Sequence, residues 1–168
     1  MMITLAPAKP TDVAPIGALL AEVDEYYGGR REERSADRLR LIHDAVFGPA
    51  PVAHVLLAWE DDNLVGFASY SFLWPAAGVT RSLYLKELYV VERSRRRGVG
   101  RLLMSELCRV ALDTGCSRVE WTADTDNPTA LRFYETLGVP PDPTKPFYRL
   151  AGDAVARMAS MAEARSVG

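Results

Sequence analysis

Residues 88–103 read LYVVERSRRRGVGRLL, and in this stretch an apolar strand passes through a glycine turn into an amphipathic helix. Five arginines stand between positions 93 and 101, around Gly98 and Gly100. A helix N-terminus presents unpaired N–H groups and the positive end of the helix dipole, and together these bind phosphate. Glycine lets a ligand approach the backbone closely. The stretch therefore predicts an α/β fold with a cradle for a phosphate-bearing ligand.

Two other interpretations of the arginines stay open at this point. A glycine turn followed by a solvated arginine face has the same short pattern. A nucleic-acid surface is also rich in arginine, but such proteins usually carry a basic excess, whereas this chain has a formal net charge of -2. The stretch has neither the Lys-Ser/Thr ending of a nucleotide-triphosphate loop nor the three glycines of the dinucleotide fingerprint. We therefore expect one small ligand and no nucleic acid.

The composition fits a single globular domain. The chain has 168 residues, of which 48% are hydrophobic and 25% charged. Two cysteines, Cys108 and Cys116, and two histidines offer neither a disulfide framework nor a metal-ligand spacing, so no metal is expected. No stretch reaches the roughly 20 apolar residues of a membrane span. We expect a cytoplasmic protein with no membrane partner and one domain over residues 1–168.

Periodicity and turn residues predict the elements. Strands are expected at 3–5, in two arms of a hairpin over 53–74, and at 81–91, 117–123 and 145–152. Helices are expected at 10–27, after Ser35 to 47, at 98–115 and at 127–138, and residues 153–168 form a terminal helix or tail. Thr11 or Asp12, Ser35 and Asn127 are the expected caps. The order predicts an α/β fold with a mixed, mostly antiparallel central sheet flanked by helices and a core over about residues 3–150.

The segment LYVVERSRRRGVGRLLMSELCRVALDTGCSRVEWTADTDNPTALRFYETLGV, residues 88–139, resembles the core of the GNAT superfamily of acetyl-coenzyme A-dependent N-acetyltransferases. The matching pieces are Arg95-x-x-Gly98-x-Gly100 after a strand, and then Asn127 followed by Tyr134 in RFYETLG. Within the superfamily the chain is most similar to the diamine (spermidine/spermine-type) and thialysine acetyltransferase branch. The stretches NLVGFASYSFLW, LYLKELYV and GCSRVEW carry that similarity.

The resemblance implies acetyl-coenzyme A as co-substrate, a GNAT-like fold and a homodimer. The pyrophosphate would lie on backbone N–H groups of residues 96–101, and the pantetheine arm would pair with strand 85–90 like an added strand. Extra arginines would meet the ribose 3′-phosphate. The residues expected at the coenzyme are Leu88, Tyr89, Val90, Arg95, Arg96, Arg97, Gly98, Val99, Gly100, Arg101 and Asn127.

Amine acetylation needs a base for the ammonium, an oxyanion donor and an acid for the leaving thiolate. The resemblance makes Tyr134 the acid, and a phenol pKa of about 10 suits that role. Strand alternation puts Glu87 on one face with Leu83, Leu85 and Tyr89, where an apolar setting would raise its pKa, although a bulge would change the face. Glu87 is therefore the expected base, Glu120 is a second candidate acting through water, and the N–H of Leu88 or Tyr89 is the oxyanion donor.

The expected acceptor site lies around Glu25, Tyr26 and Tyr27, an acidic and aromatic cluster that is otherwise a solvated helix end. Lys86 stands where the polyamine branch has an acid, and a lysine opposes a polycation. The substrate is expected to be a small-molecule primary amine. A diamine or polyamine, an amino acid with a side-chain amine, an amine-bearing antibiotic and a protein N-terminus stay open. The alternative function is a non-catalytic acyl-coenzyme A sensor on the same fold.

Overall fold

The computed structural model describes residues 2–29 and 35–163, with side chains described as far as Ser160. The chain divides into two compact units, residues 1–127 and residues 128–168. The sheet and helices α1, α2 and α3 belong to the first unit. Helices α4 and α5 belong to the second.

The sheet of the first unit has five strands in the order β1-β2-β3-β4-β5. They are β1 Ile3–Pro7, β2 His54–Glu60, β3 Asn63–Leu73, β4 Arg81–Val90 and β5 Cys116–Trp121. The first four strands pair antiparallel, and β5 runs parallel to β4 because α3 returns the chain across the sheet. The predicted α/β class, with a mixed and mostly antiparallel sheet, is confirmed.

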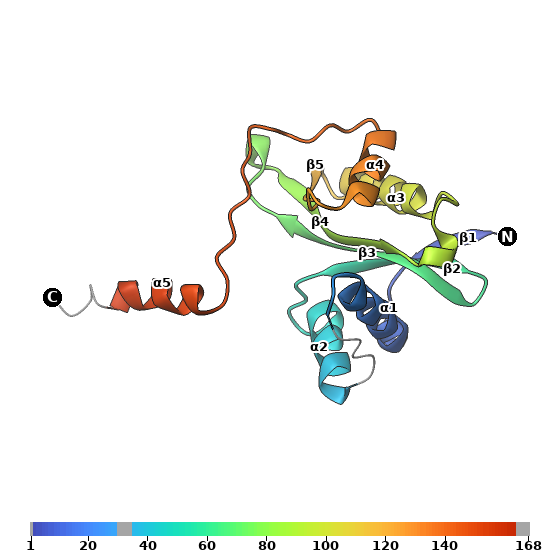
Figure 1. Ribbon diagram of the computed structural model, residues 1–168, viewed down its shortest axis with the longest axis horizontal. Helices are drawn as coiled ribbons and strands as arrows, with labels where there is room; N and C mark the ends of the chain where they lie inside the picture. The colour runs from blue at the N-terminus through green and yellow to red at the C-terminus, as the bar shows by residue number, and fades with distance from the viewer. Residues whose placement is uncertain (1, 30–34, 164–168) are drawn as a thin grey trace. The chain divides into compact units, whose positions relative to one another are not determined.

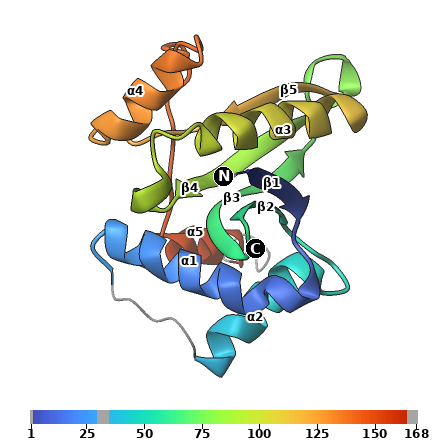
Figure 2. The ribbon, with the colours of Figure 1, turned by 90° about the vertical axis from the view of Figure 1, so that its right-hand side faces the viewer.

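Helices cover both faces of this sheet (Figures 1 and 2). α1 Val13–Tyr26 and α2 Ala36–Phe47 lie on one face, and α3 Val99–Asp113 lies on the other. Short 3-10 turns stand at Pro10–Asp12, Ala77–Val79 and Glu92–Ser94. The core between these layers includes the fully buried side chains Ile16, Leu57, Val65, Phe67, Leu83, Val91, Val99, Leu103 and Leu107.

The caps follow the prediction in part. The Ser35 hydroxyl accepts the Arg38 N–H at 3.1 Å and so caps α2 as expected. Asp12 stands at the N-cap of α1, but its side chain makes no cap bond there. Its carboxylate instead accepts the N–H of Lys9 at 2.7 Å, which closes the 3-10 turn before the helix.

The sheet opens between β4 and β5. Their parallel ladder begins with Arg81 beside Cys116 and ends with Leu85 beside Trp121, while β4 continues to Val90. Within the described part of the chain, residues 86–90 therefore have a strand partner only on the β3 side. Backbone N–H and C=O groups on the other side of this half-strand are placed to pair with an added extended chain.

A bulge at Lys86 changes which face the end of β4 presents. In the β3 register Leu85 pairs with Tyr70 and Glu87 pairs with Ser69, so Lys86 has no opposite residue. Ser69 and Tyr70 are neighbours in β3 and point to opposite faces, and paired residues share a face. The prediction that Glu87 shares a face with Leu83 and Leu85 is therefore wrong, and it lies with Tyr89 on the face opposite to them.

The second unit contains α4 Pro128–Thr136 and α5 Asp153–Glu163. The strand predicted at 145–152 is wrong, because these residues form no strand. Phe147 and Tyr148 have exposed fractions of 61% and 86%. A strand needs a neighbouring ladder for its backbone groups, and in the described residues none is paired with this segment.

Candidate active site

The turn before α3 has the backbone geometry of an anion-binding site. Arg96 (φ +60°) and Gly98 (φ +85°) are both left-handed, and Gly98 is the N-cap of α3. Successive N–H groups in a turn that visits the left-handed region form a concavity for anions. The first intrahelical bond joins the Leu102 N–H to the Gly98 carbonyl at 3.0 Å, and the first turn of α3 has no acidic residue. This end of α3 can receive a phosphate.

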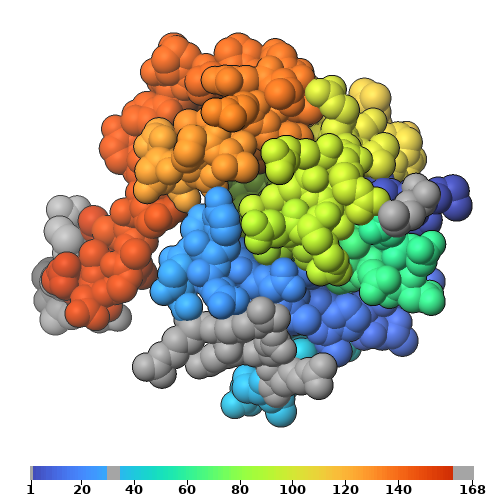
Figure 3. Space-filling model, turned by 45° about the vertical axis from the view of Figure 1, so that its right-hand side comes forward, coloured from blue at the N-terminus to red at the C-terminus, as the bar shows by residue number. Residues whose placement is uncertain are grey.

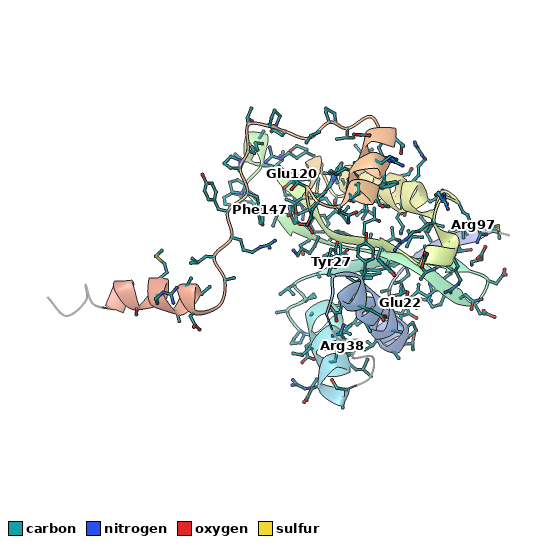
Figure 4. The ribbon with its side chains drawn as sticks, in the orientation of Figure 1. Glu22, Tyr27, Arg38, Arg97, Glu120 and Phe147 are labelled. Carbon is teal, nitrogen blue, oxygen red and sulfur yellow. The ribbon has the colours of Figure 1, made fainter. Side chains whose placement is uncertain are left out.

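The arginines around this turn do not act as one cluster. Arg97 forms a two-pronged ion pair with Glu60 at the end of β2, and hydrogen bonds from Arg97 lower the pKa of Glu60. Arg95 turns toward the end of β4, where its Nε–H donates to the Val90 carbonyl at 2.9 Å. Arg96 and Arg101 have exposed side chains beside the turn. Figure 4 shows Arg97 near the β2–β3 loop.

Glu87 and Tyr89 share a face of β4. The Tyr89 hydroxyl donates to Glu22 of α1 at 3.3 Å, so this face is the α1 side of the sheet. Burial is the largest influence on Glu87 and raises its pKa above the ordinary value. The charge of Asp124 raises it as well, while Lys86 and the Leu88 N–H act in the opposite direction. A carboxylate with a raised pKa suits proton transfer nearer to neutral pH.

The end of α1 brings two tyrosines to the same region. Burial raises the pKa of Tyr27, and the charges of Glu87 and Asp124 raise it further, which places all three groups near one another. The Tyr26 ring stands edge-on to Tyr27 with centroids 5.2 Å apart, and the Tyr26 hydroxyl donates to Asn127 Oδ1 at 3.5 Å. Figure 3 shows the end of α1 against the β4–α3 connection, and Figure 4 labels Tyr27 and Glu22 on α1.

The other predicted residues are distributed as follows. Glu120 pairs with Tyr84 across the β4–β5 ladder and forms an ion pair with Arg118 at 3.1 Å. Glu25 and Lys86 are exposed. Tyr134 lies in α4 of the second unit, half-buried, with its ring centroid 5.2 Å from that of Phe133. Leu88, Tyr89 and Val90 form the half of β4 that is open on the β5 side.

The sequence analysis missed Asp124 and the role of Glu22. Asp124 follows β5 in a polar loop, and nothing in that loop marks it as a neighbour of Glu87 and Tyr27. Glu22 was visible as part of the acidic end of α1, but its bond to Tyr89 depends on how α1 crosses the sheet.

Within residues 2–29 and 35–163, no group of three or more His, Cys, Asp or Glu side chains could hold a metal ion. No helix in the same ranges is long and apolar enough to cross a membrane.

Comparison with known proteins identifies the family. Residues 18–139 match the Acetyltransferase (GNAT) family, a match that spans the boundary between the two units. Thialysine N-epsilon-acetyltransferase of Sus scrofa is 28% identical over 148 residues, covering 81% of this chain and 83% of the relative. L-ornithine N5-acetyltransferase of Arabidopsis thaliana is 30% identical over 96 residues, covering 57% of this chain and 42% of the relative.

Solved structures show the same fold. An integron cassette protein from the mobile metagenome of V. cholerae has a TM-score of 0.83 and 29% identity, covering 95% of this chain and 98% of that one. A ribosomal-protein-alanine N-acetyltransferase from Brucella melitensis, 21% identical with a TM-score of 0.73, shares the fold. The resemblance drawn from residues 88–139 and the thialysine branch is confirmed. The chain belongs to the GNAT family of N-acetyltransferases.

Proposed function

We propose that this protein transfers an acetyl group from acetyl-coenzyme A to a primary amine of a small molecule, by direct attack in a ternary complex. The observation that carries the proposal is the open half of β4, residues 86–90, which leads to the left-handed turn at the start of α3. A long ligand with amides at one end and phosphates at the other is complementary to that sequence of features.

In this proposal the backbone of Leu88 and Val90 pairs with the pantetheine amides, with the Val90 carbonyl also accepting the Arg95 Nε–H, and Asn127 lies beside that arm. N–H groups of residues 96–101 hold the pyrophosphate, with the left-handed Arg96 and Gly98 turning them toward it. Arg96 and Arg101 add charge from the rim, since their side chains are exposed there. The ion pair with Glu60 holds the guanidinium of Arg97 at the same rim.

The proposed reaction assigns each proton transfer to one residue. Glu87 takes a proton from the ammonium of the acceptor, and the neutral amine attacks the thioester carbon. The N–H of Leu88 or Tyr89 stabilises the oxyanion, and the C–S bond then breaks. Tyr134 gives its proton to the departing thiolate, and the second proton that the amine nitrogen loses as the amide forms returns to the Tyr134 phenolate. Glu120, which forms an ion pair with Arg118, is the second candidate for the base and would act through water.

The acceptor we propose is an amino acid with a side-chain amine, bound near Glu25, Tyr26, Tyr27 and Lys86. Two of the relatives are named for thialysine and L-ornithine, which are such amino acids. Lys86 is exposed at the bulge beside Glu87 and disfavours a polycation, whereas it complements a carboxylate. The sensor alternative is not favoured, because the curated relatives named above are acyl-transferring enzymes.

The remaining proposals concern the assembly. We propose one N-acetyltransferase domain over residues 1–168, supported by a family match that covers parts of both units. A homodimer is supported by the resemblance and by the exposed apolar side chains of Phe147, Tyr148 and Leu150. Sedimentation of the purified protein tests the dimer. The cytoplasmic location stays a prediction from composition.

The first experiment is a calorimetric titration with acetyl-coenzyme A, followed by a thiol-release screen. The screen compares ornithine, lysine and thialysine with diamines and polyamines of matched amine spacing. Binding, together with turnover that is faster for the amino acids, supports the proposal. Faster turnover of the polyamines contradicts the acceptor class alone. Binding without turnover of any amine supports the sensor, and absence of binding contradicts the whole proposal.

A further inference from the structure

Arg95, the first residue of the Arg-x-x-Gly-x-Gly motif, points into the protein. Its Nε–H donates to the Val90 carbonyl at 2.9 Å, at the last residue of β4. Its guanidinium carbon lies 5.4 Å from the ring centroid of Tyr26 and 5.6 Å from that of Tyr89. One ring comes from α1 and the other from β4, so the side chain contacts both elements.

Two further contacts involve the end of α1, one to β4 and one to the loop that follows β5. The Tyr89 hydroxyl donates to Glu22 of α1 at 3.3 Å, and the Tyr26 hydroxyl donates to Asn127 at 3.5 Å. Tyr26 also stands edge-on to Tyr27, the residue that lies near Glu87. A chain of contacts therefore leads from the turn before α3, through Arg95, to the tyrosines of the acceptor site.

We propose that Arg95 is a positioning residue for the acceptor site and not a phosphate ligand. It holds the last turn of α1, which carries Tyr26 and Tyr27, against the end of β4, which carries Glu87. Arginine suits this role because its flat guanidinium can face aromatic rings while its Nε–H donates in the plane of the guanidinium. Lysine keeps the charge but has neither the planar group nor the Nε–H donor.

The inference rests on the proposed function and makes a separate prediction from it. Arg95→Lys and Arg95→Met are both expected to raise the KM for the amine about tenfold, the scale of losing partly desolvated cation–ring contacts. The Kd for acetyl-coenzyme A is expected to change less than threefold. The dependence of that Kd on salt is expected to stay the same, because the number of charges at the phosphates is unchanged.

Arg96→Met is the matched control, one residue along on the exposed side of the turn. It is expected to weaken acetyl-coenzyme A binding and flatten its salt dependence, with the KM for the amine unchanged at saturating coenzyme. The inference is overturned if Arg95→Met behaves like Arg96→Met and Arg95→Lys restores binding, which is the pattern of a phosphate ligand.

A second pair of variants separates positioning from general loss of stability. Tyr26→Phe removes the hydroxyl bond to Asn127 but keeps the ring over Arg95, so it is expected to raise the KM for the amine less than Tyr26→Leu, which also removes the ring. The double variant Arg95→Met/Tyr26→Leu is expected to be no worse than Arg95→Met alone, because the contact between Arg95 and the Tyr26 ring is already lost in that single variant. If the increases in the KM for the amine multiply in the double variant, Arg95 and Tyr26 do not act through one shared contact.

Hydrogen exchange of the unliganded protein gives a readout that needs no activity. Amides at the end of α1 bond within the last turn, as in Tyr27 N–H to Val23 O at 3.1 Å and Gly28 N–H to Glu25 O at 3.0 Å. Their exchange is expected to become faster in Arg95→Met and to stay unchanged in Arg96→Met. Unchanged exchange in Arg95→Met overturns the inference. A wild-type protein that binds no acetyl-coenzyme A contradicts the proposed function, while the exchange experiment still decides the inference.

Discussion

Glu87 combines burial with a position beside a cation, and burial is the stronger influence on its pKa. A base works only when deprotonated, so kcat/KM is expected to fall as the pH drops through this raised pKa, at a higher pH than for an ordinary glutamate. Glu87→Gln is expected to lower kcat by about 10²-fold or more and to remove this acidic limb. The pH–rate profiles of the wild type and of Glu87→Gln check both expectations. Loss of the limb in Glu120→Gln instead would move the base to Glu120.

The same group links stability to pH. A folded-state pKa above the unfolded value means that protonation favours the folded form, so the stabilising contribution of Glu87 is complete below the unfolded pKa. It is lost as the pH rises through the folded pKa. Glu87→Gln is therefore expected to unfold at higher urea concentration than the wild type at pH 7, with a smaller difference at pH 4. An equal difference at both values would contradict the burial of this carboxylate.

Tyr134 is the other residue on which the proposed chemistry depends. Tyr134→Phe removes only the phenol proton, so kcat is expected to fall by about 10²-fold while the Kd for acetyl-coenzyme A stays the same. Steady-state rates and calorimetry measure the two quantities. Phenylalanine keeps the ring beside Phe133, which leaves the packing of α4 as it is. An unchanged kcat would remove Tyr134 from the mechanism.

At the scale of elements, the start of α3 can be tested with a matched pair of glycines. Gly98 and Gly115 have φ of +85° and +70°, and a Cβ at either position meets no atom within 4 Å. Asparagine tolerates the left-handed region, so both Gly98→Asn and Gly115→Asn are expected to fold with similar small losses of stability. Only Gly98→Asn is expected to weaken acetyl-coenzyme A binding, by about tenfold or more, because its side chain enters the cradle.

Thermal unfolding and calorimetric titration of the two variants check this prediction. Equal coenzyme affinity in both variants would mean that the turn before α3 holds no phosphate. Weaker binding in Gly115→Asn as well would mean that the loss comes from the fold rather than from the cradle.

The local sequence pattern predicted the helices and strands of the first unit because each of them has a strong signal in its own residues. The apolar stripe and the Ser35 cap of α2, and the glycine turn before α3, all appear where expected. The bulge at Lys86 has no such signal, since the β3 register decides it, and it moved Glu87 to the other face. The strand predicted at 145–152 is wrong for a related reason, because an alternating pattern does not supply a partner strand. Contacts such as that of Arg95 with Tyr26 join residues far apart in the sequence, so the spacing of residues along the chain could not predict them.

At the scale of the whole molecule, the arrangement of the sheet bears on the order of the reaction. A covalent acetyl-enzyme would need a nucleophile, and the thiols are the strongest candidates. Cys116 pairs with Arg81 at the beginning of β4, whereas Glu87 and the open half-strand lie at its other end. Cys108 is exposed on α3. Neither position suits relay of the acetyl group, which favours direct attack with both substrates bound.

Initial rates measured against both substrates are therefore expected to give intersecting double-reciprocal lines, as a ternary complex requires. The double variant Cys108→Ser/Cys116→Ser is expected to keep kcat within about twofold, because neither thiol takes part in the proposed reaction and the substitution is small. Parallel lines, with activity lost in the double variant, would show that the acetyl group passes through a cysteine. Parallel lines with activity retained would point to another nucleophile, and mass spectrometry of the enzyme mixed with acetyl-coenzyme A alone would locate it. An unmodified mass in that mixture, together with intersecting lines, is the result that the position of Glu87 at the open end of β4 leads us to expect.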